Sequence, residues 1–167
     1  MPAIAPATFE QLYKDHGRDV YRFAVYLCGD SQWAEDLTSE AFLRVWTSPI
    51  PVGMPTVKAY LLTILRNLVA EESLRRARRP VAEINEQVLE GGSMIRETEA
   101  RNELAIVRAA LDELPALSRT ALLLKSEGGL SYDEIAAVLE IPAATARVKV
   151  HRARLQLAKA IGKEIVS

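Results

Sequence analysis

Apolar residues recur three and four positions apart along most of this chain, and that period most constrains its fold. In one stretch, Ala100, Leu104, Val107, Leu111 and Leu114 follow one another at intervals of four and three. This spacing places side chains on one face of a helix. Strand-like alternation is scarce, and leucine, alanine, glutamate and arginine, which favour helices, dominate. The pattern therefore predicts an all-α fold.

Capping residues and prolines divide the chain into successive helices. Thr8 and Gln11 have the spacing of a capping box before a first helix, and Ser31 is expected to cap the second. Three prolines and a glycine then exclude regular helix from residues 48–56. A third helix follows, carries an arginine-rich tail and stops at Pro80.

The length of the chain, 167 residues, allows one domain or two small ones. Apolar residues make up 49% of it and charged residues 26%, which favours a packed core over disorder. Residues 81–98 contain Gly91-Gly92-Ser93 and several glutamates, a composition typical of a linker. We therefore expect two small helical domains, residues 1–80 and 99–167, joined by an acidic flexible linker.

Several classes of protein are disfavoured by composition. One cysteine, Cys28, excludes a disulfide within the chain, and two distant histidines, His16 and His151, argue against a zinc site. Motifs for phosphate-binding loops, metalloproteases or cysteine nucleophiles are missing. No apolar run is long enough to span a bilayer, and no secretory signal is visible. We expect a cytoplasmic protein that is not an enzyme and holds no metal or cofactor.

Charge is segregated along the chain, although the formal net charge is only −1. Residues 66–80 hold five arginines and two glutamates, for +3, and residues 116–167 hold eight lysines and arginines against five acids, also +3. Between them, residues 81–115 hold three arginines and eight acids, for −5. Two basic blocks around an acidic one predict two separate contacts with a polyanion, unless surface charges cluster here by chance.

The most specific pattern is a helix-turn-helix in residues 129–154. Ser131 and Glu134 have the spacing of a capping box, and Ile141-Pro142 suits the turn before a second helix. That helix carries the cations Arg147, Lys149, Arg152 and Arg154, together with His151. A short helix, a turn and a basic helix suit the major groove of DNA. The alternative is an ordinary amphipathic helix with a solvated basic face.

The segment from Glu134 to Arg154 resembles region 4 of bacterial sigma factors of the small extracytoplasmic-function (ECF) group. Independently, residues 34–46 resemble the region 2 helix of that group, and residues 59–68 resemble its promoter-melting helix. The resemblance covers about residues 8–79 and 100–160, in the order of the family. It implies a factor that directs RNA polymerase to promoters and leaves the chemistry to the polymerase.

The resemblance assigns a role to each half of the chain. Region 2 binds a coiled coil on the largest polymerase subunit and opens the minus-ten element. Region 4 lies near a flap of the second-largest subunit and reads the minus-thirty-five element. By position, the contacts with core polymerase are Asp36, Ser39 and Glu40, an acidic helix face that complements a basic partner. Without the resemblance, a solvated acidic face is the alternative.

For the minus-ten element and the melted strands, the resemblance points to Lys58, Tyr60, Arg66, Asn67, Arg75, Arg76, Arg78 and Arg79. Asn67 can donate to and accept from a base edge, and residues 48–56 fall where the family captures a flipped base. Tyr60 is either a core residue or a stacking surface for a base. Some of the arginines can instead be solubilising surface charge.

For the minus-thirty-five element, the corresponding residues are Thr145, Arg147, Val148, Lys149, His151, Arg152 and Arg154. Val148 stands where the family usually has serine. An exposed valine at this position can touch a thymine methyl group, so the base preference is expected to differ from that of other members.

The implied partners are core RNA polymerase, promoter DNA and an anti-sigma factor. The acidic linker either threads the polymerase channel that accommodates nascent RNA or is a disordered tether. Two other functions stay open: a helix-turn-helix regulator that binds operators without polymerase, and a sigma-like decoy that sequesters an anti-sigma factor. The first leaves Asp36, Glu40 and Asn67 unexplained, and the second has no need of the cations on the last helix.

Overall fold

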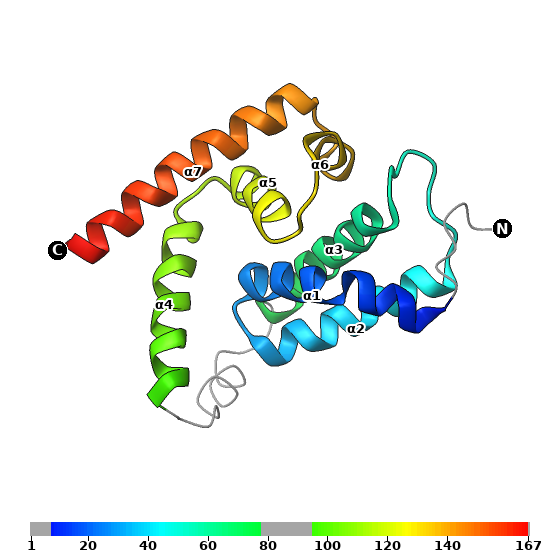
Figure 1. Cartoon of the computed structure of the whole chain (residues 1–167), viewed down its shortest axis with the longest axis horizontal. Helices are drawn as coiled ribbons and strands as arrows, with labels where there is room; N and C mark the ends of the chain where they lie inside the picture. Colours follow the sequence, from blue (N-terminus) through cyan, green and yellow to red (C-terminus); the bar gives the residue numbers. More distant parts are fainter. Residues whose placement is uncertain (1–7, 78–94, 167) are drawn as a thin grey trace.

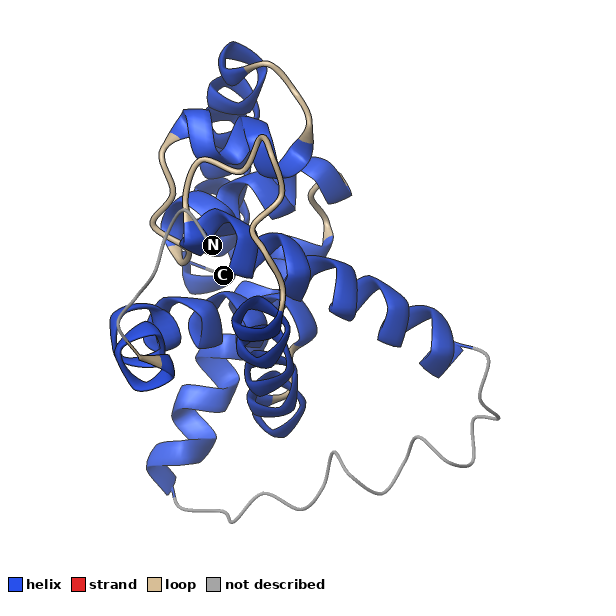
Figure 2. Cartoon of the chain, turned by 90° about the vertical axis from the view of Figure 1, so that its right-hand side faces the viewer, coloured by secondary structure: helices blue, strands red, loops and turns tan. Residues whose placement is uncertain are grey.

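The computed structural model describes residues 8–77 and 95–166 and contains, within these ranges, only helices joined by loops (Figure 2). The predicted all-α fold is confirmed. Arg78, Arg79 and most of the predicted linker lie outside the described residues. In the part of the chain that is described, no helix is both long enough and apolar enough to cross a membrane.

The first half is a bundle of three helices, α1 (Phe9–Cys28), α2 (Ser31–Thr47) and α3 (Val57–Ala77), each of which packs against the other two (Figure 1). Phe23 of α1 and Phe42 of α2 are fully buried between them. The loop between α2 and α3 is the proline-rich stretch in which the sequence excluded helix.

The cap of α2 differs from the prediction, because Asp30 and not Ser31 precedes the helix. Asp30 has extended backbone angles, and its Oδ1 accepts hydrogen bonds from the backbone N–H of Gln32 at 2.9 Å and of Trp33 at 3.3 Å. Ser31 is already helical. Aspartate and serine cap equally well, so propensity alone does not choose between adjacent residues.

The capping box predicted before α1 is only half formed. Thr8 Oγ1 accepts a hydrogen bond from the backbone N–H of Gln11 at 3.0 Å. The Gln11 side chain does not reach back to Thr8, because its Nε2 donates to Asp15 Oδ1 at 2.8 Å, one turn further along the helix. An (i, i+4) partner on the exposed face has replaced the reciprocal bond of the box.

The second half contains α4 (Ile95–Asp112), α5 (Ala116–Ser126), α6 (Tyr132–Leu139) and α7 (Ala143–Val166). The long α7 packs against the other three, and α5 also packs against α6 (Figure 1). Helix α4 begins at Ile95, so the last four residues of the predicted linker, 95–98, are helical. The capping box of α6 and the buried face of α7 determine how the basic side chains are presented.

The two halves are packed against each other through α3 with α6 and α1 with α5. Their buried apolar residues form one continuous hydrophobic cluster. Buried Gly128, just after α5, lies at this contact between the halves. A Cβ there would lie 2.8 Å from Cδ1 of Leu62 and 2.6 Å from the carbonyl oxygen of Leu124. Only glycine leaves room for this contact between α3 and the end of α5.

Substitution of this glycine tests the close packing. We expect Gly128→Ala to lower the free energy of unfolding by about 1–3 kcal/mol, because a methyl group would clash with the Leu124 carbonyl oxygen of its own segment and with Leu62 of α3. Gly162→Ala is the matched control: Gly162 lies in α7 with nothing within 4 Å of its would-be Cβ, and alanine there should stabilise the helix by up to about 1 kcal/mol. Denaturant unfolding measures both. Equal effects of the two substitutions would contradict the packing argument.

Candidate nucleic-acid interface

The predicted helix-turn-helix is formed by α6 and α7, and its capping box is complete. Ser131 Oγ accepts a hydrogen bond from the backbone N–H of Glu134 at 3.1 Å, and Glu134 Oε1 accepts one from the backbone N–H of Ser131, also at 3.1 Å. At the other end of α6, Glu140 adopts a left-handed conformation with φ of 56°. The backbone N–H of Ile141 donates to the Ala136 carbonyl at 3.1 Å, which closes the turn before Pro142.

Helix α7 presents a buried face and an exposed face. Ala146, Val150 and Ala153, spaced by four and three residues, are buried in the core. The exposed side chains among the predicted minus-thirty-five residues are Arg147, Val148, His151, Arg152 and Arg154, whereas Thr145 and Lys149 are half-buried. Val148 is 46% exposed, as its predicted contact with a thymine methyl requires.

The acidic face of α2 is exposed. Asp36, Ser39 and Glu40 all face solvent, and Glu40 pairs with Arg44 on the next turn at 3.1 Å. Sequence reasoning missed two large apolar side chains on the same helix, Leu43 at 53% exposure and Trp46 at 48%. Their positions after Glu40 were visible in the sequence, but helical spacing alone did not reveal that the bundle leaves them uncovered. Leu43 and Trp46 lie one turn apart and form a small exposed apolar patch, whose Trp46 ring also packs edge-to-face against Phe9 with ring centroids 5.7 Å apart.

Of the predicted minus-ten residues on α3, Asn67 is exposed and Arg66 is half-buried. Tyr60 packs against the hydrophobic core and stays partly exposed. Lys58 is engaged inside the bundle, because its Nζ lies 2.6 Å from Asp19 Oδ2 of α1. Among these four residues, Asn67 is the one whose side chain is exposed.

The arginine-rich end of α3 is partly neutralised. Glu72 lies 3.1 Å from Nη1 of Arg75 and 3.9 Å from Nε of Arg76. The Arg76 guanidinium also stacks 3.8 Å from the ring centroid of Trp33 on α2, and its buried Nε has no hydrogen-bond partner in the described chain. Arg76 therefore ties α3 to α2, while Arg75 keeps most of its side chain exposed.

One hydrogen bond joins the loop before α3 to the helix-turn-helix. Thr56 Oγ1 donates to Glu134 Oε2 at 2.7 Å, and the same hydroxyl accepts from the backbone N–H of Ala59 at 3.0 Å. Burial by itself would raise the pKa of Glu134, but the hydrogen bonds from Thr56 and Ser131 outweigh it and lower the pKa below its ordinary value. The same carboxylate thus caps α6 and fastens it to the first half.

Further contacts hold the halves together at their edges. Arg22 of α1 and Glu127, after α5, form an ion pair at 3.0 Å. The Arg108 side chain on α4 donates to the Tyr26 carbonyl at the end of α1 and lies against Gly29. We call the arrangement in which the two halves pack against each other the closed arrangement. In it, contacts from α4 and from the residue after α5 fix the C-terminal part of α1.

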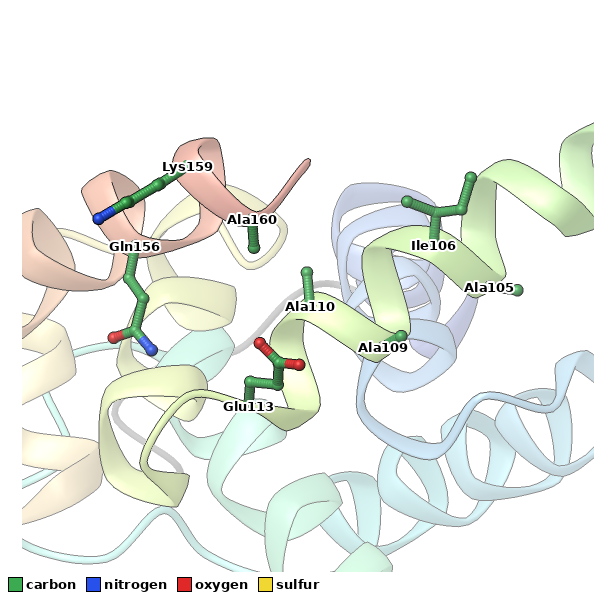
Figure 3. Close-up of a pocket in the computed structure, with 8 residues that line it drawn as sticks. All are labelled: Ala105, Ile106, Ala109, Ala110, Glu113, Gln156, Lys159 and Ala160. Carbon is green, nitrogen blue, oxygen red and sulfur yellow. The ribbon is translucent and has the colours of Figure 1, made fainter. Parts of the chain in front are cut away.

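A pocket of about 540 Å³ lies between α4 and the C-terminal part of α7 (Figure 3). It is lined by Ala105, Ile106, Ala109, Ala110, Glu113, Gln156, Lys159 and Ala160. None of these is a predicted DNA or polymerase residue, so the pocket is separate from the candidate interface. Among the described residues, no three histidine, cysteine, aspartate or glutamate side chains are grouped to hold a metal ion.

Two family models match the chain in order. Residues 12–79 match Sigma-70 region 2, and residues 104–157 match Sigma-70 region 4. The chain is 35% identical to the ECF RNA polymerase sigma factor EcfG of Rhodopseudomonas palustris, over 81% of this chain and 75% of that protein. The chain belongs to the ECF sigma factors. It is also 34% identical to the sigma factor SigE of Mycolicibacterium smegmatis, over 95% of this chain but only 63% of the length of SigE.

Solved sigma factors share the architecture of this ECF sigma factor. The sigma factor RpoE of Bartonella quintana, crystallised with the anti-sigma factor NepR, superposes with a TM-score of 0.68 at 26% identity, over 92% of this chain and 96% of that one. CnrH, in complex with the cytosolic domain of CnrY, superposes with a TM-score of 0.66 at 25% identity, over 93% of this chain and 88% of that one.

In this sigma factor, a histidine responds to the charges that hold α1 against α3. His16 is half-buried on α1, and burial, followed by the positive charge of Lys58, lowers the pKa of His16. The carboxylates of Asp15 and Asp19 act in the opposite direction without reversing the shift. His16 is therefore harder to protonate in the folded chain than in the unfolded chain, where the pKa of a histidine side chain is about 6.5.

We expect acidification to destabilise the fold through His16. Below pH of about 6.5 the unfolded chain binds a proton that the folded chain takes up only at lower pH, so the free energy of unfolding falls as the pH falls. Denaturant unfolding at pH of about 7.5 and 5.5 measures the loss, and His16→Gln should lose less than the unmodified chain. If both lose the same amount, His16 does not contribute to the pH dependence.

Proposed function

We propose that this ECF sigma factor binds core RNA polymerase in the cytoplasm, reads the minus-thirty-five and minus-ten elements and stabilises the melted strands. The observation that carries the proposal is the presence of both regions in one chain, with the helix-turn-helix directing its cations outward. The chain supplies recognition and binding, and the chemistry of RNA synthesis belongs to the polymerase. Residues 1–80, 81–98 and 99–167 are the proposed region 2 domain, linker and region 4 domain.

In region 4, we assign the reading of the minus-thirty-five element to the exposed face of α7. Arg147, Arg152 and Arg154 project from a helix whose opposite face is locked in the core, which supports a rigid entry into the major groove. Arginine can bond a guanine edge through two N–H groups, and Val148 offers an apolar contact. His151 lies on the same exposed face, and the half-buried Thr145 and Lys149 flank it; all three suit phosphate contacts.

In region 2, we assign polymerase binding to the exposed face of α2 and strand capture to α3. Asp36, Ser39 and Glu40 supply the polar contacts, and exposed Leu43 and Trp46 add apolar area beside them. Asn67 is the proposed base reader on α3, and Arg66 and Arg75 are the proposed phosphate contacts. Lys58 and Arg76 reach DNA only if their contacts with Asp19 and Trp33 are given up.

Promoter binding also requires the two halves to separate. Elements about 25 base pairs apart are on the order of 80 Å apart at 3.4 Å per base pair. In the closed arrangement, Thr56, at the end of the proposed base-capturing loop, is hydrogen-bonded at 2.7 Å to Glu134 of the helix-turn-helix. The two reading elements therefore reach their sites only after the contacts between the halves are broken.

Control by an anti-sigma factor is part of the proposal. One structural relative is a sigma factor in complex with the anti-sigma factor NepR, and another is bound to the cytosolic domain of CnrY. Both superpose over more than nine-tenths of this chain, in which the halves are closed. This similarity supports an anti-sigma partner that binds the closed form.

Charge reversal tests the reading by α7. We expect Arg147→Glu combined with Arg152→Glu to reduce promoter-dependent run-off transcription with core polymerase by about tenfold or more, because base and phosphate contacts become repulsive. Lys159→Glu, an exposed cation further along the same helix, is the matched control and should leave initiation unchanged. Unchanged initiation by the double variant would contradict the assignment. Failure to bind core polymerase, with duplex binding intact, would instead support a regulator that acts without polymerase.

A cross-link tests whether the halves must separate. In a Cys28→Ser background, Arg22→Cys and Glu127→Cys place thiols at an ion pair between the halves, and a bis-maleimide joins them. We expect the cross-linked chain to lose run-off transcription. In the control, a monofunctional maleimide blocks the same two thiols without joining the halves. This chain should support run-off transcription normally. Full activity of the cross-linked chain would overturn the requirement for opening.

A further inference from the structure

Tyr132, the first residue of α6, lies where three helices meet. Its ring centroid is 4.6 Å from Nζ of Lys125, on α5, and 4.9 Å from Cζ of Arg147, on α7. Both distances are inside the range of about 6 Å in which an aromatic ring attracts a cation. The helix-turn-helix pattern required apolar positions and a cap from α6 but assigned no role to this ring.

The ring is held in place on the protein side. Tyr132 is partly buried against the hydrophobic core and lies between the two residues of the capping box, Ser131 and Glu134. Arg147, by contrast, is exposed, and none of the described residues offers it a carboxylate partner. A long, exposed arginine side chain thus rests against a fixed aromatic surface.

We propose that Tyr132 is a positioning residue for promoter reading, whose ring holds the guanidinium of Arg147 in the orientation that meets the DNA. The inference rests on the proposed function, in which Arg147 reads the minus-thirty-five element. A contact with the ring uses none of the five N–H donors of arginine, whereas a carboxylate partner would occupy some of them. Tyr132 therefore restricts the side chain before binding and leaves its donors free for a base edge.

The second cation on the ring fits the same role. The ammonium of Lys125 adds a second positive charge at the same ring, so an anion that binds there is attracted by both cations. A phosphate of the DNA backbone beside the base read by Arg147 supplies that anion. The Lys125–Tyr132–Arg147 arrangement is thus suited to a base edge and its neighbouring phosphate.

The test varies the electrostatics of the ring without changing its shape. Position 132 of the full chain is replaced by phenylalanine and by mono-, di- and trifluorophenylalanine, which progressively weaken the attraction for a cation. Each variant is bound to core polymerase, and promoter fragments that differ in single minus-thirty-five base pairs then compete for this holoenzyme. The ratio in which two fragments are bound measures the discrimination between them. The starting fragment is the one that the unmodified holoenzyme selects from a library randomised across this element. Thermal unfolding and binding to core polymerase confirm that each variant is folded.

We expect Tyr132→Phe to discriminate as the unmodified chain does. Across the fluorinated series, discrimination should fall by about two- to fivefold in total, only at the base pairs where Arg147→Ala also loses it. Tyr132→Leu combined with Arg147→Ala should lose no more discrimination than Arg147→Ala alone. The matched pair, Tyr132→Leu with Arg154→Ala, should show additive losses, because Arg154 does not lie on the ring.

Two results overturn the inference and are distinguishable from each other. A flat fluorinated series, with discrimination lost by Arg147→Ala, shows that the ring does not position the guanidinium and leaves the proposed function intact. If Arg147→Ala loses discrimination at no minus-thirty-five base pair, Arg147 is not a reader of this element. That result removes both the assignment of Arg147 and the role of Tyr132.

Discussion

The structure depends on an apolar surface of α3 that α1 and α2 do not cover completely. Adjacent pairs of α3 residues are buried, among them Leu61 with Leu62 and Ile64 with Leu65, so its apolar stripe is wide. Part of this stripe faces the other two helices of the bundle, and Leu62 faces the end of α5 at Gly128. A wide stripe needs a second covering element, and the second half of the chain supplies it. The closed arrangement is thus a consequence of burial, and the polar contacts only fix its register.

The polar contacts between the halves are few and lie at the edges of the apolar contact. Thr56 with Glu134, Arg22 with Glu127 and Arg108 with the Tyr26 carbonyl are the main ones, and the side chain of Arg22 is half exposed. Exposed ion pairs of this kind contribute about 1 kcal/mol or less. Polar contacts of this kind add little resistance to separation of the halves, so opening must mainly break the apolar contact between them. The proposed function requires this opening, because the closed form keeps the two reading elements together.

Cations in the two halves of the chain have different roles in the closed arrangement. In region 2, Lys58 and Arg76 are occupied by Asp19, Glu72 and Trp33, so positive charge there helps to hold the bundle. In region 4, the exposed cations of α7 have a rigid helix behind them. The difference agrees with the nucleic acid that each half is proposed to read. The groove of a duplex accepts a preformed helix, whereas melted strands change position as the duplex opens.

The sequence alone determined the helical class, the helix-turn-helix with its capping box and the exposed acidic face of α2, because these features depend on spacing along one helix. It also placed Asn67 and the cations of α7 on helices, and the observed exposure agrees with those roles while the roles themselves stay predictions. Only the tertiary structure decided the cap at Asp30, the uncovered Leu43 and Trp46, the pairing of Lys58 with Asp19 and the ring that Arg147 rests on. The cap is a local choice between two adjacent residues that cap equally well. The other features depend on how neighbouring helices pack and on which of their side chains meet, and no period within a single helix carries that information.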